Sequence, residues 1–267
     1  MADTTVDIKE LLAAGAHFGH KTSRWHPKMA QYIHSKRNGS HIIDLTKTVE
    51  GLENALAFIT KTTAGGKQVL LVSTKRNAAE VVQEVAEAVK MPFVVNRWLG
   101  GMMTNQKTIS GRIKHLKSLE ERMANGELAA KYNKLEVQRF QEEIEAMNVL
   151  YGGIKNMAAK VGAVFVVDVI NDKLAVSEAH VLGIPVVAIV DTNVDPTGID
   201  YPIPANDDAA KAVKLILGYI QSAIEDGQGT AAKHAEDNKE VAADKAAKAE
   251  VQDSLIKEAP KEVKGNG

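Results

Sequence analysis

The sequence predicts an α/β fold, in which a parallel β-sheet has helices on both faces and carries an inserted helical hairpin. Three observations predict it. Short β-branched runs alternate with amphipathic helical patterns over most of the chain. One stretch in the middle has no such runs and keeps a helical spacing of apolar residues throughout. The 267 residues, 45% of them hydrophobic, can bury the core of one large domain or of two smaller ones.

Four apolar runs have the length and composition of buried strands. They are Gln68–Val72, Phe93–Asn96, Val164–Asp168 and Val186–Val190. Apolar residues spaced three or four apart predict the helices. The helical patterns run over Ile8–Leu12, Val49–Ile59, Val81–Val89, Ala175–Leu182 and Val213–Ile224. Because helices separate the strands, neighbouring strands are expected to lie parallel.

The apolar residues from Ile109 to Met123 step by 4, 3, 3 and 4 positions. After Asn125-Gly126 the helical spacing resumes at Leu128 and continues to Tyr151. This pattern predicts two long antiparallel helices joined by a glycine turn, a coiled-coil hairpin that occupies residues 105–151 and projects from the sheet domain. A helical pair packed flat on the core is the alternative.

The remaining residues divide into an α/β domain and a tail. The domain comprises residues 1–104 and 152–227. Residues 228–267 hold seven Lys and eight acidic residues, many Ala and no aromatic residue. Such a composition cannot build a core of its own, so this tail is expected to be disordered or transiently helical.

A basic stretch lies near the N-terminus. Residues 17–47 hold six Lys and Arg against one acidic residue, and five of the eight histidines. Phe18, Trp25 and Tyr32 alternate with the cations, as expected of a surface that binds phosphates and stacks on bases. Asn38-Gly39 predicts a type I′ turn and therefore a β-hairpin with the basic tip Lys36-Arg37. A solvated, charged loop is the alternative.

The net charge of −1 conceals an uneven distribution of charge. Residues 97–122 hold six cations against two acids, whereas residues 191–227 hold two cations against seven acids. Local potential governs binding to a polyanion, so nucleic acid stays a candidate partner. The absence of cysteine excludes disulfides and thiolate metal sites. With no membrane-length apolar run and an acidic, polar N-terminus, a cytosolic location is expected.

Several residues at predicted strand ends are candidates for chemistry. Lys75 and Arg76 open a helix directly after a strand, where phosphates bind in parallel sheets. Acidic residues follow two further strands and could hold Mg²⁺ or act as acid and base. These residues are Asp168, Asp191, Asp195, Asp200, Asp207 and Asp208. Turn formation and helix capping are the simpler explanation. A nucleotide or phosphosugar enzyme is the alternative function, disfavoured because no glycine-rich phosphate loop follows a strand.

Two further motifs leave alternatives open. His17, His20 and His26 are possible zinc ligands, although histidines beside cations more often contact phosphate or backbone. The segment 98–105, Trp-Leu-Gly-Gly-Met-Met-Thr-Asn, has paired glycines that allow a close approach of its backbone. That approach could be to a ligand or to the chain itself.

A series of long motifs resembles one family. AGAHFGHKTSRWHPKMAQYI, RNGSHIIDLTKT, VNRWLGGMMTN, YGGIKNM, EAHVLGIPVVAIVDTNVDP and IPANDDAAKAV occur in the order seen in the bacterial small-subunit ribosomal protein S-two family. The resemblance covers roughly Asp7 to Ile224. It implies a five-stranded flavodoxin- or Rossmann-like domain with a protruding coiled coil, no catalytic activity and no cofactor.

The resemblance also implies partners and contact residues. Family members bind small-subunit ribosomal RNA, contact neighbouring small-subunit proteins and help to anchor the OB-repeat ribosomal protein S-one. The RNA-facing positions carried over are His17, His20, Arg24, Trp25, His26, Lys28, Arg37, Arg97 and Asn105. Basic neighbours that the charge pattern adds are Lys21, Lys36, Lys75, Arg76 and Lys107. The chain departs from the family at residues 158–162, Ala-Ala-Lys-Val-Gly, where Leu-Pro-Asp is more usual, and directly after Asp168.

Overall fold

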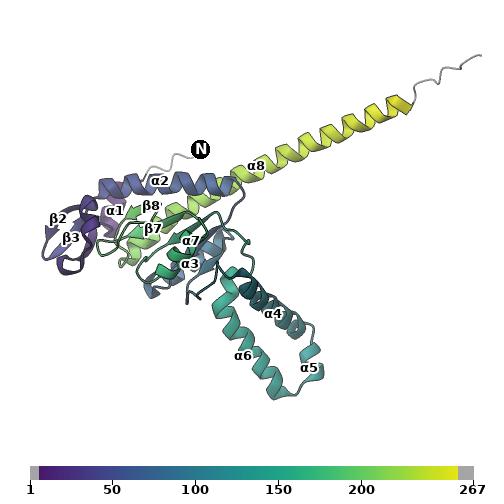
Figure 1. The fold of residues 1–267 in the computed structure, drawn as a ribbon, viewed down its shortest axis with the longest axis horizontal. Helices are drawn as coiled ribbons and strands as arrows, with labels where there is room; N and C mark the ends of the chain where they lie inside the picture. Colours follow the sequence, from purple (N-terminus) through teal and green to yellow (C-terminus); the bar gives the residue numbers. More distant parts are fainter. Residues whose placement is uncertain (1–5, 258–267) are drawn as a thin grey trace, which may run out of the picture.

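The computed structural model describes residues 6–257, and their side chains as far as residue 233. Its body is a five-stranded parallel sheet of order β5-β4-β6-β7-β8 (Figure 1). The strands are β4 (Val69–Val72), β5 (Phe93–Val94), β6 (Ala163–Val166), β7 (Val186–Val190) and β8 (Tyr201–Pro204). The predicted fold class is confirmed, and the four predicted strands are all present.

Strand β8 was not predicted from the residues, because its sequence is Tyr-Pro-Ile-Pro. Proline has no N–H to donate to a ladder and is therefore confined to sheet edges and strand ends. β8 is an edge strand and pairs only with β7 in this sheet. The edge position is what makes two prolines tolerable here.

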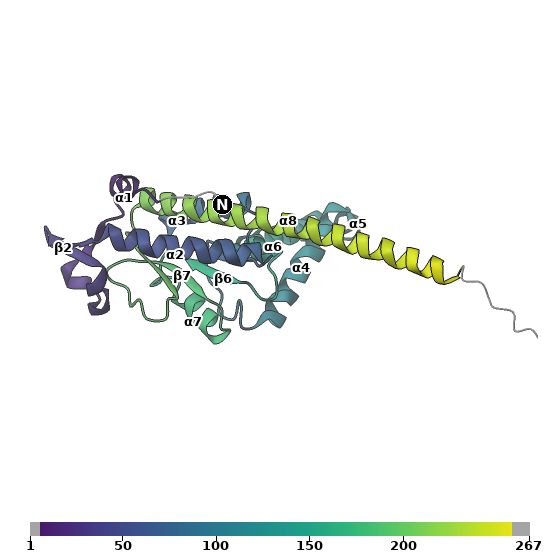
Figure 2. The ribbon, with the colours of Figure 1, turned by 90° about the horizontal axis from the view of Figure 1, so that it is seen from above.

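Helices cover both faces of the sheet, as predicted. One face packs against α1 (Ile8–Ala14), α2 (Leu45–Ala64), α3 (Arg76–Ala88) and the first half of α8, around alternate strand residues such as Leu71 and Phe165. The other face packs against α7 (Lys173–Val181) and the segment 98–109, around Leu70 and Val166. Figure 2 shows α2 and α8 running side by side over the sheet.

A second, three-stranded sheet lies at one end of the body (Figure 1). Its order is β1-β3-β2, with β1 (Phe18–Lys21), β2 (Ile33–Arg37) and β3 (Ser40–Ile43) all antiparallel. The 3₁₀ turns η1 (Thr22–Arg24) and η2 (Pro27–Tyr32) connect β1 to β2. Asn38 and Gly39 have φ of 50° and 75°, which confirms the predicted hairpin turn. Strand β1 was not predicted.

The inserted hairpin projects from the body, as predicted (Figure 1). It consists of α4 (Gln106–Ala124), α5 (Glu127–Lys131) and α6 (Lys134–Tyr151), and η3 (Gly152–Ile154) returns the chain to β6. Leu116, Leu119 and Ile144 form a small core of its own. The prediction of one helix from Leu128 to Tyr151 was wrong. Helix α5 ends at Lys131, and Asn133 caps the start of the separate helix α6 through a capping box with Glu136.

Helix α8 (Ala210–Lys257) begins on the sheet and extends beyond the body (Figures 1 and 2). Residues 228–257, part of the predicted tail, therefore take the helical alternative, and residues 258–267 lie outside the described residues. That the helix is transient there stays a prediction. None of the described helices combines the length and apolar character needed to cross a membrane.

Candidate nucleic-acid interface

The three-stranded sheet and its connections, residues 17–47, are called the basic sheet below. Lys21, Arg24, Lys36 and Arg37 are exposed on it, and none of them forms an ion pair with a described side chain. The hairpin turn at Asn38-Gly39 brings Lys36 and Arg37 to the tip of β2. Local geometry therefore gathers four cations that have no carboxylate partner among the described side chains on one small element.

An aromatic ring lies among these cations. The Lys36 ammonium group is 5.7 Å from the centroid of the Trp25 ring, within the range of a cation–π contact. Trp25 also contacts His41, whose ring centroid is 5.2 Å away. His41 is fully buried, and its two ring nitrogens have no hydrogen-bond partner among the described residues. Burial, and then the charge of Lys36, lower the pKa of His41. The His41 ring therefore acts as an uncharged support for Trp25.

The loop after β7 fixes the basic sheet to the body. The backbone N–H of His20 donates to Thr192 Oγ1 at 2.9 Å, and that of His26 donates to the Thr192 carbonyl at 2.7 Å. Gly19 lies so close that a Cβ on it would be 2.6 Å from Thr192 Cγ2. Any other residue at position 19 would place its Cβ against the Thr192 side chain, so this contact requires glycine.

Two of the predicted contact residues are held by the same loop region. Lys28 Nζ donates to Asp195 Oδ2 at 2.9 Å and to Thr197 Oγ1 at 2.7 Å. His26 Nε2 is 3.8 Å from the same carboxylate oxygen. Hydrogen bonds from Thr197 and then Lys28 lower the pKa of Asp195. Lys28 therefore carries a charge that is already balanced, unlike Lys21 or Arg37.

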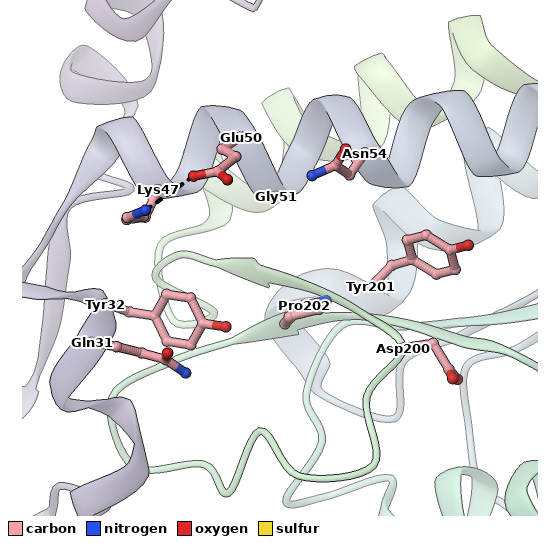
Figure 3. A pocket seen from close by; sticks show the side chains of 9 residues that line it. All are labelled: Gln31, Tyr32, Lys47, Glu50, Gly51, Asn54, Asp200, Tyr201 and Pro202. Atoms are coloured by element: carbon pink, nitrogen blue, oxygen red, sulfur yellow. Dashed lines mark hydrogen bonds and ion pairs between the residues drawn. The ribbon is translucent and has the colours of Figure 1, made fainter.

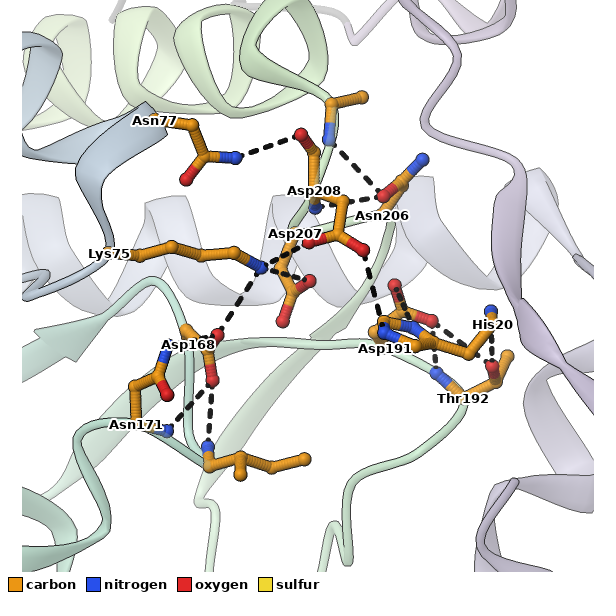
Figure 4. Close-up of polar contacts among 12 residues, drawn as sticks. His20, Lys75, Asn77, Asp168, Asn171, Asp191, Thr192, Asn206, Asp207 and Asp208 are labelled. Atoms are coloured by element: carbon orange, nitrogen blue, oxygen red, sulfur yellow. Dashed lines mark hydrogen bonds and ion pairs between the residues drawn. The ribbon is translucent and has the colours of Figure 1, made fainter. Parts of the chain in front are cut away.

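The strand-end aspartates converge at the carboxyl edge of the large sheet, as Figure 4 shows. We call Asp168, Asp191, Asp207 and Asp208, with Lys75 and His20, the acidic edge cluster. Lys75 Nζ lies 3.3 Å from Asp168, 2.9 Å from Asp207 and 2.6 Å from Asp208. His20 Nδ1 lies 3.0 Å from Asp191, and its Nε2 lies 3.5 Å from Asp208. A cation at the start of a helix opposes the helix dipole unless an anion lies beside it. At the start of α3 the aspartates of the chain itself supply that anion.

Burial and mutual repulsion set the charge state of this cluster. Asp168, Asp191 and Asp207 are buried, while Asp208 is exposed. Burial raises the pKa of Asp207 to about 6, and the charges of Asp168 and Asp191 add to this effect against the Lys75 hydrogen bond. Burial alone would lower the pKa of Lys75, but its hydrogen bonds to Asp207 and Asp208 raise it. A hydrogen bond to Asp191 raises the pKa of His20.

Two of these aspartates also form turns, as the simpler explanation predicted. Asp168 accepts hydrogen bonds from the backbone N–H groups of Ile170 and Asn171 at 2.9 and 3.0 Å. The backbone carbonyl of Asp191 accepts from the Val194 N–H at 3.1 Å, which closes a turn, and its side chain accepts from the N–H and the hydroxyl of Thr192. The turn-forming interpretation is therefore confirmed for both, although each also takes part in the cluster.

Three residues of the cluster have the ligand types and the spacing that a divalent cation requires. Ligand atoms of His20, Asp191 and Asp207 lie within 4.8 Å of one another, close enough to reach one divalent ion. This is the one group of its kind among the described side chains. The predicted grouping of His17, His20 and His26 is different: the His17 ring contacts Phe18, and His26 contacts Asp195.

Sequence reasoning missed Glu178, which organises the segment 98–105. This buried carboxylate accepts hydrogen bonds from Trp98 Nε1 at 3.0 Å, from the Gly101 N–H at 2.7 Å and from the Met103 N–H at 2.9 Å. Thr104 donates to it through both its N–H and its hydroxyl. Gly101 of the pair therefore serves an approach of the chain to itself, whereas a Cβ on Gly100 would meet no described atom within 4 Å. The signal in the sequence was an acidic residue among the apolar residues of α7.

The remaining predicted contact residues lie away from the basic sheet. Arg97, Asn105 and Lys107 are exposed near the base of the helical hairpin, where Asn105 caps α4. Arg76 is exposed in the first turn of α3. The fourteen residues proposed to contact RNA thus fall into three groups: the basic sheet, the carboxyl edge and the hairpin base. Their contacts with RNA stay predictions.

The comparisons with known proteins agree with the resemblance. The family model of ribosomal protein S2 matches residues 11–227. A small ribosomal subunit protein uS2 from Dehalococcoides mccartyi is 47% identical over 224 residues, which cover 84% of this chain and 91% of that protein. The uS2 protein of Fusobacterium nucleatum is 48% identical over 224 residues, with the same coverage. That of Roseiflexus castenholzii is 48% identical over 227 residues, or 85% of this chain and 86% of that protein. The matched region contains both the sheet domain and the helical hairpin, so the chain belongs to the ribosomal protein S2 family of small-subunit ribosomal proteins.

Proposed function

We propose that the chain binds small-subunit ribosomal RNA through the basic sheet and catalyses no reaction. As a member of its family it is a structural component of the small ribosomal subunit and acts in translation in the cytoplasm. The observation that carries the proposal is the set of four exposed cations on one small sheet, none of them paired with a described side chain. Free cations release counterions when they meet phosphates, which is the main source of affinity for RNA.

The acidic edge cluster does not favour binding a phosphate. Four carboxylates surround one lysine and one histidine there, and three of the four are buried. An incoming phosphate would have to displace an existing ion pair and would meet like charges at close range. This distribution supports the basic sheet as the RNA-facing element and argues against a phosphosugar or nucleotide enzyme.

A salt titration tests the RNA proposal. Replacing Lys21, Arg24, Lys36 and Arg37 by Gln should make the slope of log affinity against log salt shallower by about 0.7–0.9 for each phosphate that the variant no longer neutralises. The fold should survive, because the hairpin depends on its turn and not on charge. The control variant replaces Lys9, Lys173, Lys211 and Lys214 by Gln, which are exposed on α1, α7 and α8 and pair with no described side chain. An equal slope in both variants would contradict the proposal.

The Trp25 ring gives a second test of the same site. Trp25→Leu removes the flat ring but no charge, so we expect weaker binding with an unchanged salt slope. Loss of base stacking typically lowers the binding free energy by about 1–3 kcal/mol for each base. A Trp25→Leu variant that binds small-subunit RNA as tightly as the original chain would remove Trp25 from the interface.

We also propose that the projecting hairpin helps to anchor the OB-repeat ribosomal protein S-one. The support is the resemblance, together with a hairpin that has its own small core and stands away from the body. Deleting residues 116–147 and inserting four glycines removes that core and leaves Ile109 in the main core. The variant should enter small subunits that are depleted in protein S-one, measured by quantitative mass spectrometry. Subunits with a full complement of protein S-one would refute this role, and an aggregated variant would refute an independent hairpin.

A further inference from the structure

A row of surface hollows lies where α2 meets β8. It consists of three hollows of about 500, 440 and 810 Å³. The first and second share Tyr32 and Pro202, and the second and third share Asn54 and Tyr201. Neighbouring hollows therefore share walls, and we call the row of three the β8 groove. Figure 3 shows the middle hollow, between α2 and β8.

The groove begins at the basic sheet. Tyr32, at the end of η2, lines its first two hollows, and Lys28 lines the first. In the middle hollow, Lys47 and Glu50 of α2 form an ion pair of 3.1 Å, and the exposed Asp200 adds one further carboxylate (Figure 3). A chain that leaves the basic sheet along this side therefore meets its next unpaired cations in the third hollow.

The third hollow is basic. Lys61, Lys67 and Lys160 line it, and none of the described residues that line it is acidic. The three lysines come from α2, from the loop before β4 and from the loop before β6, and they form no ion pair among the described side chains. Gly162 allows these segments to meet, since a Cβ on it would lie 2.5 Å from Thr62 Cγ2 and 2.7 Å from Lys67 Cβ.

Aromatic rings lie along the same groove. The rings of Phe58 and Tyr201 stack at a centroid distance of 4.2 Å and an interplanar angle of 15°. Both are half-buried and line the third hollow. A groove that combines cations without carboxylate partners with partly exposed rings is the arrangement by which proteins hold single-stranded nucleic acid: the cations contact phosphates and the rings stack on bases.

We propose that the β8 groove binds a single-stranded segment of RNA that continues from the basic sheet. The inference rests on the proposed RNA-binding function and adds a second contact surface to it. The phosphates lie against Lys61, Lys67 and Lys160, and unpaired bases lie against Tyr201 and Phe58. A duplex keeps its bases stacked inside and cannot use these rings.

An acidic peptide is the other class of polyanion that three lysines attract, and the structure favours it less. A peptide added as a further strand would need the free edge of β8. Helix α2 lies against β8 at that point, where a Cβ on Gly51 would be 2.5 Å from the Pro202 carbonyl oxygen. The partly exposed rings also match flat bases better than acidic side chains.

The test is the binding of a fluorescent twelve-nucleotide oligouridylate to the full chain, followed by fluorescence anisotropy over a range of salt concentrations. The groove variant replaces Lys61, Lys67 and Lys160 by Gln. Its matched control replaces Lys173, Lys211 and Lys214, which are exposed lysines on α7 and α8, by Gln. We expect the groove variant to bind at least tenfold more weakly, with a salt slope shallower by about 2, from roughly 0.7 for each neutralised phosphate. The control should change by less than twofold.

A second variant tests the rings. Tyr201→Leu keeps an apolar side chain over Phe58, and we expect it to weaken oligouridylate binding with no change of slope. A groove variant that binds oligouridylate like its control overturns the proposal. Equally effective competition by a twelve-residue polyglutamate also overturns it, in favour of an acidic peptide. If the groove variant is unaffected while the basic-sheet variant loses small-subunit RNA, the proposed function stands and the groove inference fails.

Discussion

The basic sheet and the acidic edge cluster meet at the loop after β7, through His20, and use their cations in opposite ways. Neighbouring residues of β1 show the difference: His20 faces Asp191 and Asp208, whereas Lys21 is exposed and pairs with no described side chain. Lys75 and Arg76 show the same difference at the start of α3: Lys75 pairs with Asp207, whereas Arg76 is exposed. A cation in a motif is therefore available to a polyanion only if the fold has not already given it a carboxylate.

The largest expected effect comes from removing the paired cation. Lys75→Met leaves Asp168 and Asp207 without their ion-pair partner, and a buried pair broken on one side typically loses about 3–5 kcal/mol of unfolding free energy. We expect a loss of about 3 kcal/mol for Lys75→Met, at the lower end of that range, because the Lys75 side chain is only partly buried. Arg76→Met should change stability by less than about 0.5 kcal/mol. Urea unfolding measures both changes. Equal losses of unfolding free energy in the two variants would contradict the contrast between the paired Lys75 and the exposed Arg76.

Glu178 is a third case, a buried carboxylate stabilised by hydrogen bonds alone. Its oxygens accept from N–H and O–H donors, and it has no cation partner among the described side chains. Burial raises the pKa of Glu178, but the hydrogen bonds from Trp98 and the backbone of Met103 outweigh it, and the net shift is downward. Glu178→Gln replaces one carboxylate oxygen, which accepts hydrogen bonds, by an NH₂ group that faces the same donors. We therefore expect the unfolding free energy to fall by about 2 kcal/mol. Glu80→Gln on the exposed face of α3 is the control.

The pH dependence of the Glu178 contribution follows from that lowered pKa. A depressed pKa stabilises the fold above the ordinary pKa of glutamate, and this stabilisation is lost as pH falls through the folded value. The difference in unfolding free energy between the original chain and Glu178→Gln should therefore shrink in acid. A difference that grows in acid would show that Glu178 is not held as a carboxylate.

A smaller effect is the opposite pH dependence of the contributions that His20 and His41 make to stability. The pKa of His20 is raised by its hydrogen bond to Asp191, so its stabilising contribution is complete below pH 6.5 and is lost as pH rises through the folded value. The pKa of His41 is lowered by burial, so its contribution is complete above pH 6.5 and is lost on acidification. His20→Gln should therefore cost more stability at about pH 6 than at about pH 8, and His41→Phe should be relatively most stabilising at about pH 5. Parallel pH profiles for the two variants would remove the distinction.

The smallest effect is expected outside both regions. Truncation after Gly227 removes the projecting part of α8, whose interactions with the body include a hydrogen bond from Gln228 Nε2 to the Val89 carbonyl. Few large apolar residues are removed, so the melting temperature should fall by less than about 4 °C. A larger fall, measured by calorimetry, would mean that this part of the chain packs on the domain.

Much of the architecture was predictable because it depends on local patterns. The four predicted strands, the Asn38-Gly39 turn and the helical hairpin all follow from the spacing of apolar residues and from turn chemistry. The break before α6 was missed, although the Asn133–Glu136 capping pair is a local signal of a new helix start. Strand β8 was not predictable, since its prolines oppose a strand everywhere except at an edge, and edge position is a property of the assembled sheet.

The fold class and the place where cations and rings are concentrated follow from local patterns, because periodicity, turns and composition are properties of neighbouring residues. Which cations have a carboxylate partner among the described side chains depends on contacts between residues far apart in the chain. Lys75 meets Asp207 from 132 positions away, and His20 lies beside Thr192 from 172 positions away. Glu178 likewise reaches Trp98 across 80 positions. Electrostatic pairing depends on distances of a few ångströms in space, and no local pattern in the chain encodes which distant carboxylate will be there.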